Sequence, residues 1–481
     1  MTMTQLFHQE TEFQRNQRHI IKRIIIRGNL ILDTPTCLGS GDSESPTDLS
    51  LLRDSVSNHA LLTGASIAGA IRNYLREYQN SDESSLFGGL RTHEDGDQSP
   101  LIINDAISSE IIQPELRDGV KINSVTRTAD PKKKYDLELL QAGAEFPLCF
   151  ELLIEKESDE SSLIKGLAIA LQGLKQGEIS LGIKKHRGFG RCHIKEWQVW
   201  QFDLTDYQQR LDWLRFEHWQ LFPDYPTHEL IAQALNVSLD EKDDQREFCK
   251  IDTTFTLASP LLIRSGQASS DKAPDVVHLK SRRNGELKPV LSGTSLAGVL
   301  RHRAERIINT IGKNVSIIED IFGSDLSKNK ISEAKASRLI VHESVIENTT
   351  DLVQNRIAID RFTGGTLYGA LFNEQPIFSK KDTKKDTHFK LNLELRNPEN
   401  HEIGLLLLLL KDLWTGDLPV GGTSSIGRGR LQGKDVTITL QKKGEKTTFT
   451  IVQSSPQENL VINDADSLEK FVSALNKEVN K

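Results

Sequence analysis

The chain has 481 residues, of which 37% are hydrophobic and 26% charged, and its formal net charge is −7. This composition is typical of a soluble globular protein of two or three domains, and the negative charge argues against a generic DNA-coating protein. The longest apolar run, Leu405–Leu410, is too short to cross a bilayer, and the polar residues 1–19 lack a signal-peptide pattern. Four scattered cysteines without zinc-type spacing favour reduced thiols, so we expect a cytoplasmic protein with no membrane partner.

The first half of the chain predicts the element order β-α-β-β-α-β, which is the ferredoxin-like arrangement. The isoleucine-rich residues 20–33 predict a strand, and the spacing of apolar residues predicts a helix over 63–77. Two further strands, a second helix and a last strand are expected at Leu101–Ala106, Phe146–Ile154, Leu163–Leu174 and Cys192–Trp200. A basic loop, Asn123–Lys134, separates the two middle strands.

The second half repeats this order. Apolar and polar side chains alternate along Phe248–Leu257, which predicts a strand with one buried face. Helices are expected at 295–311 and 402–414, and strands at Leu339–Val345 and Phe389–Leu395. The two halves are separated by 203–246, where we expect two short helices around Thr205–Glu217 and His228–Leu235.

Three pairs of segments recur in the same order, namely Thr63–Arg72 and Ser292–Arg301, 86–89 and 321–324, and the glycine-rich 181–191 and 420–430. The two members of each pair lie between 229 and 239 positions apart. This spacing indicates a tandem duplication of an α+β domain. We therefore expect a flexible N-terminus, a first domain, a helical connector, a second domain and a C-terminal tail, at 1–19, 20–202, 203–246, 247–445 and 446–481.

The two repeated helices each begin at a turn of small residues. Ser66 and Ser295 lie in these turns, and Arg72 and Arg301 follow on the helices. The first turn of a helix has free backbone N–H groups and the positive end of the helix dipole, which suits an anion such as phosphate. The alternative is an ordinary N-capped core helix. Because the feature occurs twice in matching surroundings, we favour RNA binding by these four residues.

The glycine-rich segments and central loops of both halves carry clustered basic residues. Segment 420–430 is not a nucleotide-binding P-loop, because Arg428-Gly429 replaces the required Lys-Ser/Thr and a strand follows. Solvated surface turns are the alternative for each loop alone. The repetition at matching positions favours contacts with the RNA backbone. The candidate RNA-binding residues are Arg127, Lys184, Lys185, His186, Arg187, Arg191, Arg356, Arg361, Arg428 and Arg430.

Together these repeated motifs resemble the RAMP superfamily of CRISPR proteins. The similarity covers about 20–200 and 248–440, and it is greatest to the backbone (Cas-seven type) subunits of type III effector complexes. The chain resembles two such subunits fused in one polypeptide, as in the type III-D branch. The resemblance implies RRM-like domains with inserted thumb-like loops that bind CRISPR guide RNA. It also implies complementary target RNA, other backbone subunits and a large subunit as partners.

The resemblance further implies a catalytic aspartate in the loop before the first helix of each domain, acting with Mg²⁺ or Mn²⁺. Asp48 fits this place in the pattern Asp-x-x-x-x-Arg53-Asp, and Asp275 fits it in the second half, with Lys280 at the arginine position. Asp271 is an alternative second candidate. RNA supplies its own 2′-hydroxyl nucleophile, so positioning and one carboxylate for the metal or proton suffice for cleavage.

Three functions remain open from the sequence. The chain is an RNA-cleaving subunit with one or two aspartate sites, or a guide-RNA scaffold without chemistry. The third is a repeat-processing endoribonuclease of the kind found among relatives, which generally uses a histidine near the first helix. His59 is the local candidate for that role.

Overall fold

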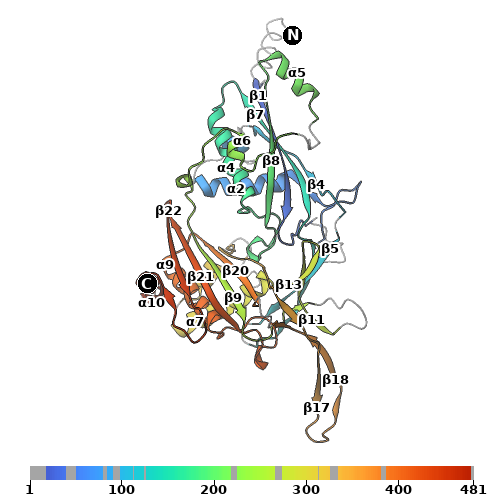
Figure 1. The fold of residues 1–481 in the computed structure, drawn as a ribbon, viewed down its shortest axis with the longest axis vertical. Coiled ribbons are helices and arrows are strands. Elements are labelled where there is room, and N and C mark those ends of the chain that lie inside the picture. The colour runs from blue at the N-terminus through green and yellow to red at the C-terminus, as the bar shows by residue number, and fades with distance from the viewer. Residues whose placement is uncertain are drawn as a thin grey trace, which may run out of the picture.

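The computed structural model describes residues 18–39, 50–79, 84–89, 98–111, 113–123, 126–217, 225–265, 274–312, 314–325, 334–380 and 386–477. Figure 1 shows two domains that follow one another along the long axis, with the long hairpin β17–β18, formed by Gln354–Ile359 and Thr366–Gln375, extending beyond the second domain. Within the described residues, no helix is long and apolar enough to span a membrane.

The first domain consists of an antiparallel sheet in the order β3-β7-β1-β8 and two helices that cover one face. On β1, Ile24 and Ile26 point into this core and are fully buried, as expected for a strand with a side-chain period of two. The elements of this domain are β1 (Ile20–Leu32), α2 (Gly64–Gln79), β3 (Leu101–Ile103), β7 (Glu145–Glu155), α4 (Glu160–Lys175) and β8 (Cys192–Asp203).

The second domain has the same arrangement, with the strand order β14-β20-β9-β21. Its core includes Ile251 and Phe255 of β9, whose neighbours Asp252 and Thr254 face outward. The equivalent elements are β9 (Phe248–Leu257), α7 (Gly293–Thr310), β14 (Leu339–Val341), β20 (His388–Arg396), α9 (Asn400–Trp414) and β21 (Leu431–Lys442). The predicted α+β fold with two tandem ferredoxin-like units is therefore confirmed.

The expected C-terminal tail continues the second domain. β22 (Glu445–Val452) pairs with β21 along its length, through a tight turn in which Lys443 and Gly444 both have positive φ. β23 (Val461–Ile462) adds the next strand, and α10 (Ala465–Lys477) packs on α9. The second sheet thus has six strands.

The connector covers the outer face of the first sheet. Its helix α5 (Tyr207–Arg215) is followed by Phe216, whose ring lies 5.1 Å from that of Trp200. The Arg27 guanidinium lies over both rings, at 5.3 Å from Trp200 and 5.2 Å from Phe216. The outer face of the first sheet is therefore covered by the chain itself. A second short helix of the connector, α6 (Ile231–Ala234), packs on α4 and β8 at the helix-covered side.

A long β-hairpin is inserted into each domain between its second and third main strands. In the first domain it consists of β5 (Pro114–Ile122) and β6 (Ala129–Leu140). The predicted loop Asn123–Lys134 therefore begins at the end of β5, but its last part, from Ala129, is strand and not loop. β6 begins with exposed residues on both faces, which removes the apolar alternation that marks a strand. Ion pairs stabilise it instead, since Lys134 Nζ lies 3.6 Å from Asp118 across the hairpin.

Short elements complete the two domains. They are β2 (Leu61–Leu62), α3 (Ser84–Phe87), β4 (Ala106–Ile107), β10 (Arg264–Ser265), β11 (Val276–His278), β12 (Lys280–Arg283), β13 (Glu286–Leu291), α8 (Ser316–Phe322), β15 (Ser344–Val345), β16 (Thr349–Asp351) and β19 (Ile377–Ser379).

Candidate nucleic-acid interface

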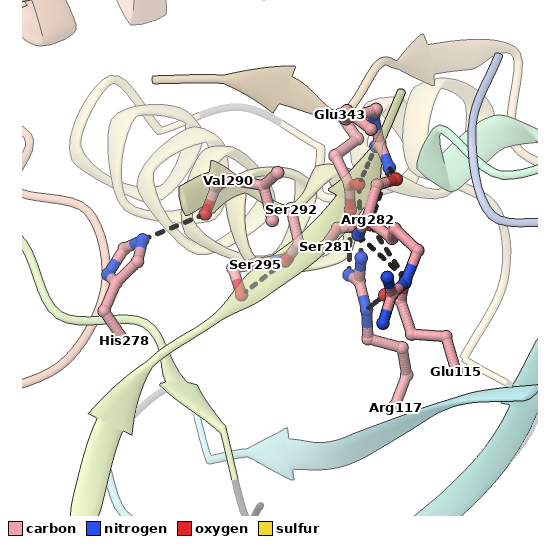
Figure 2. Close-up of polar contacts among 10 residues, drawn as sticks. Glu115, Arg117, His278, Ser281, Arg282, Val290, Ser292, Ser295 and Glu343 are labelled. Carbon is pink, nitrogen blue, oxygen red and sulfur yellow. Dashed lines mark hydrogen bonds and ion pairs between the residues drawn. The ribbon is translucent and has the colours of Figure 1, made fainter. Parts of the chain in front are cut away.

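Both repeated helices begin with the same N-cap. The Thr63 hydroxyl accepts from the Ser66 backbone N–H at 3.3 Å, and the Ser292 hydroxyl accepts from that of Ser295 at 3.2 Å. In each pair the two hydroxyls also lie 2.9 Å apart, as Figure 2 shows for Ser292 and Ser295. This capping stabilises the helix start. RNA binding by Ser66 and Ser295 stays a prediction.

The arginines of these helices connect the first two repeated motifs. Arg72 Nη2 donates to the carbonyl of Gly88 at 3.2 Å, and Arg301 Nη1 donates to that of Gly323 at 3.0 Å. Both glycines belong to the repeated Leu/Ile-Phe-Gly segments. The recurrence of these motifs therefore has a structural cause in both domains. RNA binding by Arg72 and Arg301 stays a prediction.

The first glycine-rich loop packs against the second domain. Arg187 Nη2 donates to the Phe322 carbonyl at 3.4 Å. A Cβ on Gly188 would lie 2.4 Å from the Glu343 backbone nitrogen, and a Cβ on Gly293 would lie 2.4 Å from the Arg187 carbonyl oxygen. Only glycine permits such close approach, so both positions are needed for the contact between the domains.

A buried ion cluster holds the hairpin β5–β6 on the second domain (Figure 2). Arg117 donates to both oxygens of Glu343, at 2.8 and 3.2 Å, and Arg283 pairs with the same carboxylate. Glu115 pairs with Arg117 at 2.5 Å and accepts from the Ser281 hydroxyl at 2.9 Å. Burial opposes ionisation of Glu343, but the two arginines outweigh it and hold its pKa below the usual range. The cluster is electrically balanced and fixes the hairpin in place.

A set of basic side chains lies beside this cluster, where the first glycine-rich loop meets β14. We call it the basic seam, and it consists of Lys185, His186, Arg187, Arg191 and His342. Its residues come from both domains, so docking of one domain on the other creates it.

The basic seam accumulates positive charge in a partly desolvated place. Burial and then neighbouring cations lower the pKa of His186 to about 4, and burial and then Arg191 and Lys250 lower that of His342 to about 3. The pKa values of Lys185 and Arg187 are also lowered, first by burial and then by nearby arginines. An anion entering the seam would relieve all of these unfavourable interactions.

The basic seam also contains hydrogen-bonding atoms that are not used. Four buried side-chain atoms lack a hydrogen-bond partner among the residues that the structure describes. They are Arg187 Nη1, Arg191 Nε, His342 Nδ1 and the nearby Ser344 Oγ. Such atoms are costly unless water or a ligand satisfies them. Of these atoms, the two guanidinium nitrogens are charged donors, which suit phosphate oxygens.

Two other predicted residues lie on or against the hairpin β5–β6. Lys184 Nζ lies 3.8 Å from the centre of the Tyr135 ring, a cation–π contact that orients the loop. Arg127 occupies the turn of the β5–β6 hairpin, with a φ of 57°. Burial lowers the pKa of His302 on α7, and Arg301 and then Arg127 lower it further. The hairpin therefore brings further positive charge to the second domain.

The predicted residues of the second domain divide into two kinds. Arg428 and Arg356 both contact the buried carboxylate of Glu374, at 2.8 and 2.9 Å. By contrast, Arg361 at the end of the hairpin and Arg430 after the glycine-rich loop are exposed. The structure thus does not bring these four arginines into one site.

Of the predicted catalytic residues, Asp48 and Asp271 lie outside the described residues. Asp275 is exposed, and its Oδ2 accepts from the Asn373 backbone N–H at 2.8 Å. Among the described residues no group of three or more His, Cys, Asp or Glu side chains could hold a metal ion. Since Mg²⁺ commonly binds through one carboxylate together with substrate phosphates, Asp275 fits the metal only with RNA present. His59 Nδ1 hydrogen-bonds the Ser108 carbonyl at 2.7 Å.

Comparison with known protein families matches the RAMP superfamily over residues 29–193 and 254–432. The chain belongs to this superfamily. The two matched segments coincide with the two ferredoxin-like units, so each unit is a RAMP domain. RAMP proteins work with RNA in CRISPR ribonucleoprotein complexes, and the match supports a general role of that kind. A search of curated proteins gave no match.

Equivalent backbone hydrogen bonds show which residues of the two RAMP domains correspond near the predicted catalytic loops. The Leu52 carbonyl accepts from the Leu61 N–H, and the Leu279 carbonyl accepts from the Val290 N–H in the same way. Leu52 and Leu279 are 227 positions apart, and the same offset relates Asp48 to Asp275. The alignment therefore favours Asp275 over Asp271 as the counterpart of Asp48.

Sequence reasoning missed Arg117, Glu343 and His342. Arg117 and Glu343 are 226 positions apart, and no local pattern announces a pair of that separation. One signal was present, because β14 is followed by a polar His-Glu pair where the apolar run ends. Polar residues at the end of a core strand are candidates for contacts between domains.

Proposed function

We propose that this chain is a double backbone subunit of a type III CRISPR effector complex, resembling the type III-D branch, and that guide RNA binds in its basic seam. The observation that carries this proposal is the set of buried, unpartnered side-chain nitrogen atoms of Arg187, Arg191 and His342 among the described residues. Membership of the RAMP superfamily supplies the class of ligand. Other backbone subunits and a large subunit would complete the complex, in the cytoplasm.

Charge explains why the ligand is a polyanion. Glu77 acts on Lys185, but it already pairs with Arg396 at 3.1 Å and cannot neutralise the rest of the basic seam. A run of RNA phosphates would supply several negative charges at regular spacing. Binding would then release counterions and weaken steeply with added salt.

We further propose that complementary target RNA is cleaved near Asp48 and Asp275. Asp275 is exposed and fixed by one backbone hydrogen bond, so its carboxylate is available to accept a proton or contact a bound metal. A divalent ion bound with the RNA, Mg²⁺ or Mn²⁺, would stabilise negative charge on the phosphate. The protein would hold one nucleotide so that its 2′-oxygen lies in line with the leaving oxygen.

RNA binding is tested by fluorescence anisotropy with a labelled guide RNA. The double variant Arg187→Gln/Arg191→Gln should bind at least about a hundredfold more weakly, since hydrogen bonds to charged groups contribute about 1.5–3 kcal/mol each and about 1.4 kcal/mol is a factor of ten. Lys470→Gln, on the exposed side of α10, is the matched control and should bind like the wild type. Equal affinity of all three proteins would refute binding in the basic seam.

Cleavage is tested by mapping target-RNA products of the assembled complex. Asp48→Ala and Asp275→Ala should each remove one product, and the double variant should bind target without cutting it. Both products persisting in the double variant would exclude these sites. A wild-type complex that binds target RNA and never cuts it would leave the alternative function, a guide-RNA scaffold.

A further inference from the structure

A buried cluster around Glu374 joins three parts of the second domain. Arg428, from the glycine-rich loop, donates from Nη1 to Glu374 at 2.8 Å and to the Thr423 hydroxyl at 3.1 Å. Its Nη2 donates to Gln354 of the hairpin at 2.6 Å. Arg356 Nε, also on the hairpin, lies 2.9 Å from the same Glu374 oxygen. Only 1% of the Glu374 side chain is exposed, so these contacts are shielded from water.

The third part that this cluster reaches is the strand that begins after Asp275. Val276 of β11 pairs in parallel with Glu374 of β18. The neighbouring Asn373 donates its backbone N–H to Asp275 Oδ2 at 2.8 Å. The Asp275 carboxylate is therefore held by the backbone next to the buried glutamate. Because Asn373 and Glu374 are consecutive, a shift of the backbone at Glu374 would move the donor that orients Asp275.

The first domain has an apolar cluster at the same place. Thr36 forms an antiparallel β-bridge with Leu140, and Leu261 forms the corresponding bridge with Ile377 in the second domain. Leu137 and Glu374 each precede the bridged residue by three positions, so they are equivalent. Phe189 occupies the position of Arg428, and Cys37 completes the buried cluster. Apolar side chains can thus close the base of this loop in the RAMP fold. The ionic version in the second domain is not required for folding alone, since replacing buried ion pairs by apolar groups is often neutral.

We propose that Arg428 and Glu374 are positioning residues for Asp275, which couple the second glycine-rich loop to the proposed cutting site. This inference rests on the proposed function. The tip of that loop, Ser424–Ile426, is accessible and precedes Arg428 by two residues. RNA seated on the tip would fix Arg428, and Arg428 fixes Glu374 and the strand beside Asp275. The first cutting site lacks this coupling, because its domain has Phe189 and Leu137 instead.

The test uses the assembled complex and the double variant Arg428→Leu/Glu374→Leu, which copies the apolar pair of the first domain. Arg356 keeps access to water, since 32% of its side chain is exposed. The kcat for the Asp275-dependent product should fall about tenfold or more, with an unchanged KM, because misplacement by about 1 Å can cost about a hundredfold. The Asp48-dependent product should form at the wild-type rate in the same reaction. The single variant Arg428→Lys keeps a positive charge beside the Glu374 carboxylate. Its kcat for the Asp275-dependent product should therefore lie much closer to the wild-type value than that of the double variant.

Three outcomes would overturn the inference. If the double variant cuts target RNA at both sites as fast as the wild type, the positioning role is overturned and the proposed cleavage stands. Equal loss of both products, together with a lower melting temperature, would assign the pair to stability. A wild-type complex without an Asp275-dependent product would overturn the proposed cleavage at that site, and the inference with it.

Discussion

The two RAMP domains share one fold and differ in what their inserted hairpins and glycine-rich loops contact. In the first domain both features dock on the second domain, through the Glu343 cluster and the glycine contacts at Gly188 and Gly293. In the second domain the hairpin carries Phe362 and Tyr368 fully exposed. The surface formed by the hairpin and the glycine-rich loop therefore occurs twice. The copy in the first domain forms the interface between the domains, and the copy in the second domain is exposed at the end of the molecule.

This difference explains where the proposed RNA site forms. The cations of the first glycine-rich loop gain burial and close neighbours because His342 and Arg396 of the second domain lie against them. The second loop has no such partner among the described residues, and Ile426 at its tip is 51% exposed. Duplication and docking together create a site that neither domain has alone.

The largest expected effect comes from Glu343→Ala. Removal of this carboxylate leaves Arg117 and Arg283 buried without their main counterion, which should cost about 3–5 kcal/mol of stability. The counterpart in the first domain is Asp105, which accepts from the Gly64 N–H at 2.7 Å, so Asp105→Ala should cost only about 1 kcal/mol. Urea unfolding measures both values. Equal losses would contradict the special role of the central interface.

Glycine substitutions in α7 provide a second test. A Cβ at position 293 would lie 2.3 Å from the Val341 carbonyl oxygen as well as near Arg187, so Gly293→Ala should destabilise by about 1–3 kcal/mol. Gly298 has nothing within 4 Å, so Gly298→Ala in the same helix should stabilise by about 0.5–1 kcal/mol. Thermal unfolding should shift in opposite directions for the two variants. If both variants raised the melting temperature, the backbone around Gly293 would have to move to make room for a Cβ, and the close packing there would not be rigid.

Salt dependence distinguishes the docked loop from the free loop. Arg187→Gln should reduce the slope of log affinity against log salt by about 0.7, the value for one lost contact with single-stranded RNA. Arg430→Gln, at the exposed end of the second loop, should change the slope less. Filter binding of guide RNA between low and physiological salt gives both slopes. Larger dependence on Arg430 would move the main RNA contact to the second loop.

The smallest expected effect concerns acid stability. Burial lowers the pKa of His278 to about 4 from 6.5, while its Nδ1 accepts from the Ile263 N–H at 3.1 Å. The unfolded chain therefore binds protons first, so stability should fall as the pH drops from 6.5 towards 4, and stay level above 6.5. Calorimetry across this range measures the trend. His278→Gln should flatten it, and an unchanged slope in the variant would show that other groups dominate.

The sequence predicted the parts of the fold that depend on local periodicity. Alternation along β9 and the apolar spacing of α2 and α9 follow from one buried face each, and all three elements lie where expected. The hairpin β5–β6 was missed because its outer half has no buried face. β22 was missed because its strand is mostly exposed and only Phe449 is fully buried in it.

The candidate site was predictable only in part, because its geometry depends on docking between the domains. Lys185, His186, Arg187 and Arg191 were found from clustered charge in a glycine-rich loop. His342 was not, since nothing local relates it to a loop about 150 residues earlier. The partners of Arg72 and Arg301 were hidden for the same reason, although their motifs recur at similar spacing.

The most direct test of the central claim is the pKa of His342 with and without guide RNA, measured by NMR on protein with labelled histidines. In the free protein it should lie near 3, because the ring is buried beside Arg191 and Lys250. A phosphate in the basic seam would supply the missing negative charge, so the pKa should rise clearly when RNA binds. RNA binding at full affinity with an unchanged His342 pKa would contradict the proposal that the guide lies between the two domains.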